Sequence, residues 1–231
     1  MTIQTGLIKL RLRLNKLHSS DYDNIPDWTA IEAINKAQLE WIRKQIHGGN
    51  AFREGDETSR MRVDDLQVLL KEVTLGGMNK KIYFESKELP KDYLYLKRVT
   101  PTASSNGCSG MSMLTTLVEE ANVSNYLNDW GMRPSFEWAE TFHTLVGNKI
   151  RVYTQGTFHV SDISLMYYRR PRAVDIQGYT KEDGTNSSTQ HFEFKEDICE
   201  LILDEATAII AGSIGDYNNA QMTKGRADQT N

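Results

Sequence analysis

The chain has 231 residues, of which 39% are hydrophobic and 25% charged, and its formal net charge is −4. This length fits one elaborated domain or two small ones, and it is enough to bury a core without disulfides or structural metals. The negative balance argues against a dedicated nucleic-acid-binding protein, which normally has an excess of basic residues, although a local basic patch stays compatible with it.

Cysteine usage and the amino terminus bear on the compartment. Cys108 and Cys199 are not part of a CxxC or CxxH pattern, so the sequence predicts free, reduced thiols with no disulfide framework and no zinc site. The first nine residues lack the charged-then-apolar order of a signal peptide, and no apolar run approaches the roughly 20 residues that cross a bilayer. We therefore expect a soluble product, kept in a cell or in a particle assembled there, without a membrane partner.

Two amphipathic helices are predicted at the start of the chain. Leucines recur at helical spacing over residues 7–17, with basic residues between them. After a break at 19–26, a second apolar face extends from Ala30 to Ile46 and ends at Gly48-Gly49, where glycine supplies a left-handed backbone. This pattern predicts an antiparallel helical hairpin. The cations of the first helix are Lys9, Arg11, Arg13 and Lys16.

After a charged loop and a short predicted helix at 62–71, the pattern changes to that of strands. Aromatic and branched residues predict strands at 81–85 and 93–99. Residues 100–110 are rich in Ser, Thr, Gly and Asn and predict a loop, and 118–130 predicts a helix. Periodicity does not decide between strand and helix for 111–118.

Turn signals organise the rest of the middle region. Gly147-Asn148 is a strong hairpin signal between predicted strands 136–146 and 149–154. A second reversal at Gln155-Gly156 leads into a strand that extends to Tyr168. Together these segments predict an antiparallel β-meander of about five strands.

The closing part combines a basic stop, one core helix and a polar tail. Arg169-Arg-Pro-Arg172 ends the last strand, because Pro171 cannot donate a ladder hydrogen bond. A polar loop leads to a buried helix at about 196–212. Residues 216–231 have little to bury and predict an extended tail that a neighbouring subunit orders.

The predicted fold class is therefore α+β, with a helical hairpin and a C-terminal helix packed with an antiparallel β-meander. We assign residues 1–75 to a helical part and 76–195 to a β-rich part. The core helix at 196–215 belongs to the same domain as 1–75, and 216–231 form the tail.

The motifs of common reaction chemistries are missing from the sequence. Residues 48–55 lack the Gly-Lys-Ser/Thr ending of a phosphate-binding loop, and Gly107-Cys-Ser-Gly110 lacks the strand-turn-helix context of a nucleophile elbow. The five histidines are scattered singly, without the helical i, i+4 spacing of metal ligands. We therefore predict no catalytic, cofactor or metal site, and no enzyme.

Two basic features remain as candidate contacts. They are the cations of the first helix and the arginines Arg169, Arg170 and Arg172. Both features fit interface ion pairs between proteins or contacts to DNA phosphates, and nearby acidic residues weaken the second interpretation.

Several segments together resemble a known group of proteins. They are Leu14–Asn24, Ile34–Gln45, Val146–Tyr153, Tyr167–Pro171 and Asp197–Gly212. In this order they resemble virion structural proteins of crAss-like tailed bacteriophages, of the kind that form neck rings below the portal. The resemblance covers most of the chain and has no catalytic fingerprint.

The resemblance implies a non-enzymatic head-to-tail adaptor that assembles as a closed ring, dodecameric in the group it resembles, around the DNA channel. Its implied partners are itself, the portal, adjacent neck or tail ring proteins and DNA passing without sequence specificity. It also implies a virion location after synthesis in the cytoplasm of the bacterial host. A closed ring needs two chemically different faces, and we expect the basic first helix and the acidic residues of the last helix to supply them.

Three alternatives stay open. Within the same class, the chain fits a tail-completion or tail-tube terminator subunit. From other classes, it fits a nucleic-acid-binding protein that uses its basic features, or a hydrolase centred on Cys108.

Overall fold

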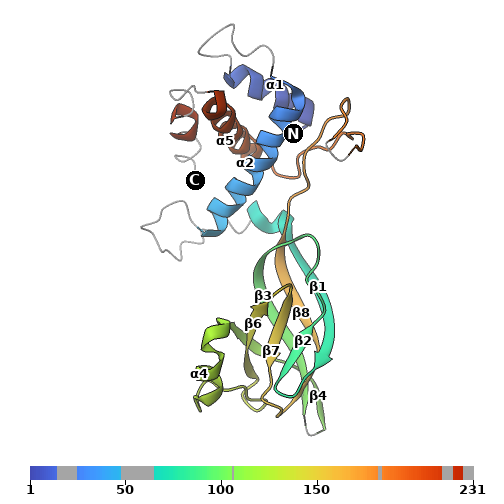
Figure 1. Ribbon diagram of the computed structural model, residues 1–231, viewed down its shortest axis with the longest axis vertical. Coiled ribbons are helices and arrows are strands. Elements are labelled where there is room, and N and C mark those ends of the chain that lie inside the picture. Colours follow the sequence, from blue (N-terminus) through green and yellow to red (C-terminus); the bar gives the residue numbers. More distant parts are fainter. Residues whose placement is uncertain (15–24, 48–64, 106, 182–183, 215–220, 226–231) are drawn as a thin grey trace. The chain divides into compact units, whose positions relative to one another are not determined.

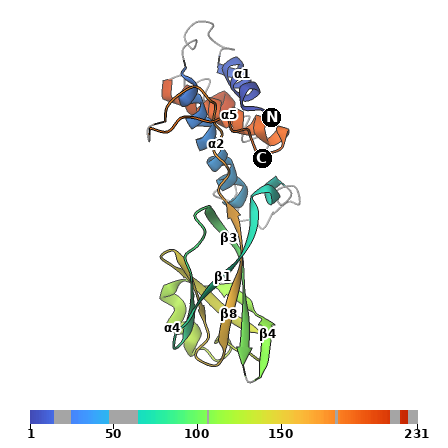
Figure 2. The same ribbon diagram turned by 90° about the vertical axis from the view of Figure 1, so that its right-hand side faces the viewer.

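The structure is a computed structural model that describes residues 1–14, 25–47, 65–105, 107–181, 184–214 and 221–225 (Figures 1 and 2). The chain forms two compact units. Unit 1 comprises residues 1–68 and 171–231, and unit 2 comprises residues 69–170. Residues 171–195, which the sequence analysis assigned to the β-rich part, thus belong with the helices, and 69–75 belong with the strands. None of the described helices is long and apolar enough to cross a bilayer.

Unit 1 is built on three helices: α1 (Ile3–Leu14), α2 (Asp27–His47) and α5 (Glu196–Ile214). All three helices were predicted, and α1 begins four residues earlier than its leucine pattern indicated. The predicted α1–α2 hairpin needs a correction, because α1 and α2 each pack mainly against α5 and touch each other little. The reason is that α5 is apolar on most of its surface, with residues such as Ile198, Ile202 and Ile210 buried, so it accepts a helix on two sides.

The segment between unit 2 and α5 is held against α2. The Asn35 side chain donates to the carbonyl oxygen of Val174 at 3.1 Å and accepts from its N–H at 2.8 Å. Asp175, which is 5% exposed, accepts from the Tyr179 hydroxyl and pairs with Lys181, both at 2.7 Å. Burial alone raises the pKa of Asp175, but these hydrogen bonds outweigh it and hold the pKa below its ordinary value. The described residues of the predicted polar loop, 173–181 and 184–195, are therefore part of unit 1.

The predicted extended tail is only partly within the described residues. Residues 221–225 are helical, and Thr223 is buried. This part of the tail is therefore helical, not extended, and it contains a buried side chain. A helical turn pairs its backbone groups locally.

Unit 2 contains one eight-stranded mixed sheet in the order β4-β3-β8-β1-β2-β7-β6-β5. Its strands in the first half are β1 (Leu70–Asn79), β2 (Tyr83–Ser86), β3 (Tyr93–Ser105), β4 (Cys108–Ser112) and β5 (Leu114–Leu117). Those in the second half are β6 (Glu140–Val146), β7 (Lys149–Tyr153) and β8 (His159–Arg169). A 3-10 turn, η1 (Gln67–Leu69), precedes β1, and η2 (Glu120–Asn122) continues into the short helix α4 (Val123–Asn128).

The sheet confirms the α+β class but is barrel-like, and the predicted simple meander is wrong in its topology. β5 and β6 are parallel, and β3 pairs with β8 although four strands separate them in sequence. β5 returns to β3: the Met113 N–H bonds the Pro101 carbonyl at 3.0 Å, and the Thr115 hydroxyl bonds the Val99 carbonyl at 2.6 Å. Such long-range pairings leave no local sequence signal, so periodicity alone does not reveal them.

Two local predictions are also wrong. Residues 62–64 of the helix expected at 62–71 lie outside the described residues. The described part ends in η1, and from Leu70 the chain is strand β1, because residues 70–76 pair with β8. The loop expected at 100–110 is largely strand: β3 continues to Ser105, and β4 begins at Cys108. Long-range pairing overrides the weak strand propensity of these Ser- and Thr-rich residues. The undecided 111–118 segment contains the end of β4 and all of β5.

The turn predictions hold. The β6–β7 hairpin turns at Gly147, whose φ is +61°, and the second reversal has positive φ at both Gln155 and Gly156. Inside the sheet, a buried cluster that includes Phe84, Ile163 and Tyr167 forms the core. A smaller cluster of Val118, Phe142 and Tyr153 fastens α4 to the sheet.

Candidate protein interaction surface

The basic residues of α1 are engaged inside unit 1. Lys9 pairs with Glu200 and lies 3.9 Å from Glu196, and Arg13 pairs with Glu200 at 2.5 Å and Asp204 at 2.6 Å. Burial raises the pKa of Glu200, but hydrogen bonds from Lys9 and Arg13 outweigh it and lower the pKa overall. These cations therefore hold α1 to α5.

The other charges proposed for two ring faces behave in the same way. Arg11 pairs with Asp27 at 2.6 Å, and Lys44 pairs with Glu205 at 2.8 Å. Lys16 lies outside the described residues. These basic and acidic side chains thus pair with each other within unit 1. They are therefore no longer candidates for two oppositely charged faces of a ring.

The second basic feature is divided between the units. Arg169 and Arg170 belong to unit 2, where the Arg169 guanidinium donates to the Arg170 carbonyl at 3.1 Å. Arg172 belongs to unit 1 and pairs with Glu193 at 2.8 Å. The structure does not gather the three arginines into one described site.

Candidates for chemistry are equally scattered. Cys108 is exposed at the start of β4, and Cys199 is buried in α5, where burial raises the pKa of its thiol to about 11. Within the described ranges, no group of three His, Cys, Asp or Glu side chains has metal-binding geometry.

A different surface, on unit 2, stands out by its exposed apolar side chains. Two are tryptophans, Trp130 and Trp138, which are 80% and 78% exposed, and a third is Leu114, which is 73% exposed. Leu117 and Met132 are each 54% exposed. We call these five residues the tryptophan surface. Large apolar side chains that stay exposed are typical of interaction sites, and tryptophan is among the residues that contribute most to protein–protein binding.

Hydrogen bonds connect the parts of this surface. The N–H of Leu114 on β5 bonds the carbonyl of Ala139, next to Trp138. Asp129 accepts from the backbone of Met132 and Gly131, and the Arg133 guanidinium lies 5.9 Å from the centre of the Trp130 ring. The surface is therefore formed by β5 and residues 129–139 together.

Aromatic packing supports the surface from below. Tyr126 of α4 lies 5.3 Å from Phe142 of β6, measured between ring centroids, and Phe142 stacks on Tyr153 of β7 at 4.8 Å. The Tyr153 hydroxyl donates to the Glu120 carboxylate at 3.3 Å. Because these rings are anchored in the sheet, the exposed side chains lie on a rigid support, which lowers the entropic cost of binding.

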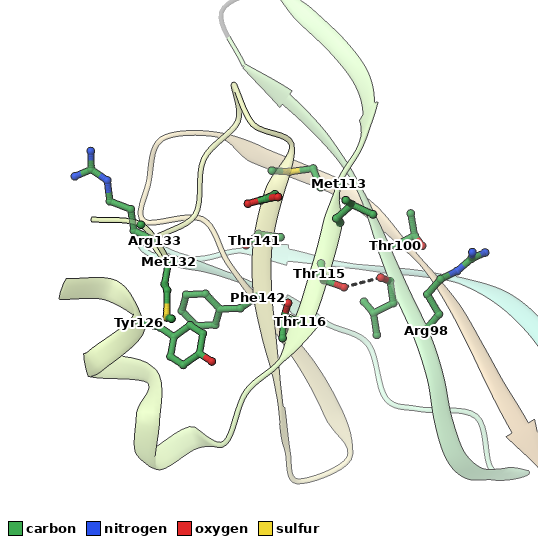
Figure 3. Close-up of a pocket in the computed structure, with 14 residues that line it drawn as sticks. Arg98, Thr100, Met113, Thr115, Thr116, Tyr126, Met132, Arg133, Thr141 and Phe142 are labelled. Atoms are coloured by element: carbon green, nitrogen blue, oxygen red, sulfur yellow. Dashed lines mark hydrogen bonds between the residues drawn. The ribbon is translucent and has the colours of Figure 1, made fainter. Parts of the chain in front are cut away.

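A cavity of about 460 Å³ opens beside the tryptophan surface, where β5 and β3 face each other (Figure 3). Tyr126, Met132 and Phe142 gather on one side of it, while Arg98 and Arg133 point outward on opposite sides. Pairing with β6 uses the N–H groups of Leu114 and Val118.

The surroundings of the surface are acidic. Residues 119–140 contain five carboxylates and one arginine, a net charge of −4. Glu119, Glu137 and Glu140 are exposed and form no ion pair with a described residue. Exposed apolar and acidic side chains therefore occur together in this part of the chain, a combination that protein interfaces also show, and we call Glu119, Glu137 and Glu140 the acidic rim of the surface.

The sequence analysis did not identify this surface. The available signal was the stretch 130–138, which contains two tryptophans and a methionine together with a glycine and a proline. Apolar residues that follow neither helical nor strand periodicity do not form one apolar face that could pack in a core. Such a pattern indicates that these side chains are exposed.

Comparisons with known proteins add no relative. No protein-family model matches the chain, and a search of curated proteins found no match.

Proposed function

We propose that this chain is a structural virion protein that forms an oligomeric ring at the head–tail junction of a tailed bacteriophage. The observation that carries the proposal is the tryptophan surface on unit 2. A ring subunit needs side chains that stay exposed in the single chain and become buried on assembly. Trp130, Trp138 and Leu114 meet this requirement.

The resemblance to neck proteins of crAss-like phages supports the particular location. In this proposal the ring surrounds the DNA channel between the portal and the tail, and its partners are further copies of the chain and the adjacent ring proteins. It acts by binding and has no catalytic step. The chain is made in the host cytoplasm and functions in the virion.

Electron microscopy of purified virions, with mass spectrometry of their proteins, tests the proposal. We expect the chain among the virion proteins and its two units in density at the neck. Density only at the far end of the tail tube identifies the tail-terminator alternative instead, and absence from the virion overturns the proposal.

A binding experiment separates this function from the nucleic-acid alternative. A ring subunit held by apolar contacts associates with its partners at both 50 and 500 mM salt, whereas affinity for DNA phosphates falls steeply over this range. Tight DNA binding with a steep salt dependence, together with no protein association, favours the nucleic-acid-binding function.

A further inference from the structure

Unit 2 is electrically asymmetric. The segment 119–140, which carries most of the tryptophan surface, has a net charge of −4. The rest of unit 2 has eleven Lys and Arg residues and five Asp and Glu residues, a net charge of +6. The segment 119–140 and the rest of unit 2 therefore have opposite net charges.

A second exposed apolar group lies in the basic part. The turn between β1 and β2 exposes Met78 and Ile82, at 61% and 40%, beside the exposed Lys80 and Lys81. The two lysines form no ion pair with a described residue, and the Lys80 ammonium lies 3.3 Å from the Met78 sulfur. We call these four residues the lysine turn.

The two surfaces lie on different sides of the same unit. In the strand order, β7 and β6 separate β2 from β5. Figure 1 shows α4 on one side of the strands of unit 2 and β1 and β2 on the other. A contact between the tryptophan surface of one copy and the lysine turn of the next thus leaves a free lysine turn on the first copy and a free tryptophan surface on the second.

We propose that the tryptophan surface binds the lysine turn of a second copy of this chain. The apolar side chains pack together, while Lys80 and Lys81 meet the acidic rim at Glu137 and Glu140. This contact is heterologous, so repeating it gives either a closed ring or a filament. The inference rests on the proposed ring function and names the subunit contact that builds it.

Charge exchange in the full-length chain tests the contact by sedimentation velocity. The variants are Glu137→Lys with Glu140→Lys, Lys80→Glu with Lys81→Glu, and all four changes together. Facing like charges oppose association, so we expect each double variant to raise the dissociation constant about tenfold or more. The fourfold variant restores opposite charges, and its dissociation constant returns to within about threefold of the original value.

A matched control changes the net charge equally at other exposed lysines, Lys91→Glu with Lys97→Glu on the β3 side. Its dissociation constant is expected to stay within about twofold of the original. Thermal unfolding confirms that all variants fold.

Three results overturn the inference: an original chain that stays monomeric at about 1 mM, a fourfold variant no better than the double variants, or an equal loss in the control. None of these removes the proposed function, which depends on the presence of the chain at the virion neck. Conversely, if the chain self-associates in this way but is absent from virions, the inferred contact stands and the proposed function is overturned.

Discussion

The two units use their charged and apolar side chains in opposite ways. In unit 1, Lys9, Arg13 and Lys44 pair with acids of α5, so the charges stabilise the packing of helices. In unit 2, the rim charges at Glu137 and Glu140 have no described ion-pair partner, and two tryptophans nearby are exposed. The charges that are conspicuous in the sequence thus have a structural role, and the better candidate for binding is a stretch without a regular pattern.

The largest expected effect tests the structural role of the charges in unit 1. Lys44→Met leaves the Glu205 carboxylate, which is 6% exposed, without its cation. Breaking such a buried pair costs about 3 to 5 kcal/mol of unfolding free energy, measured by urea denaturation at pH 7.

The matched control is Lys36→Met, since Lys36 lies 3.9 Å from Glu40 and its side chain is 60% exposed. We expect a cost below about 0.5 kcal/mol. Equal costs for the two variants contradict the distinction between internal and surface charges.

The second effect concerns acid stability of unit 2. His143 is 3% exposed, its two ring nitrogens have no hydrogen-bond partner in the described structure, and burial lowers its pKa to about 4. Because the unfolded chain binds this proton near pH 6.5, stability is complete above that pH and falls as the pH drops towards 4. The loss amounts to about 3 kcal/mol.

His143→Leu removes this loss, which is measured as unfolding free energy from pH 7 to 4. His159→Leu, at an exposed position of β8, is the control for a histidine substitution as such. An unchanged acid slope in His143→Leu refutes the assignment.

A smaller effect is expected for the pairing of α1 with α5. Arg13→Met removes charge-assisted hydrogen bonds to Glu200 and Asp204 and lowers the unfolding free energy by about 1 to 2 kcal/mol. Arg11→Met removes one pair of side chains that are each about half exposed, and costs less than about 0.5 kcal/mol. Calorimetry measures both. We expect self-association of both variants to stay unchanged. A loss of self-association indicates instead that α1 takes part in a contact between subunits.

The two exposed tryptophans of unit 2 are expected to contribute least to stability and most to assembly. Trp130→Ala with Trp138→Ala changes the unfolding free energy by less than about 0.5 kcal/mol, because both side chains are exposed. The same variant weakens self-association by about tenfold or more. Trp28→Ala, at another exposed tryptophan on α2, is the control and leaves association intact. Equal association of the two variants removes the special role of the tryptophan surface.

Where a structure depended on neighbouring residues, the sequence predicted it. The spacing of apolar residues in α1, α2 and α5 gives one face per helix, and glycine at 147 and 156 permits the positive φ that the two reversals need. These are short-range constraints, so reading along the chain finds them. The α+β class follows from the same patterns.

The tertiary structure alone decided which segments pair and which side chains remain exposed. Residues 70–76 and 100–104 are strands because β8 lies between them, and the paired residues are 55 or more positions apart in sequence, the smallest separation being that of Ser104 and His159. Lys9 and Arg13 of α1 are structural because α5, 191 positions further along the chain, brings its carboxylates to them. Trp130 and Trp138 are exposed and belong to neither of the two buried clusters of unit 2, which only the packing of the sheet reveals. Partners that are distant in sequence leave no local periodicity, which is why the sequence determined the elements and only the packing determined the surface.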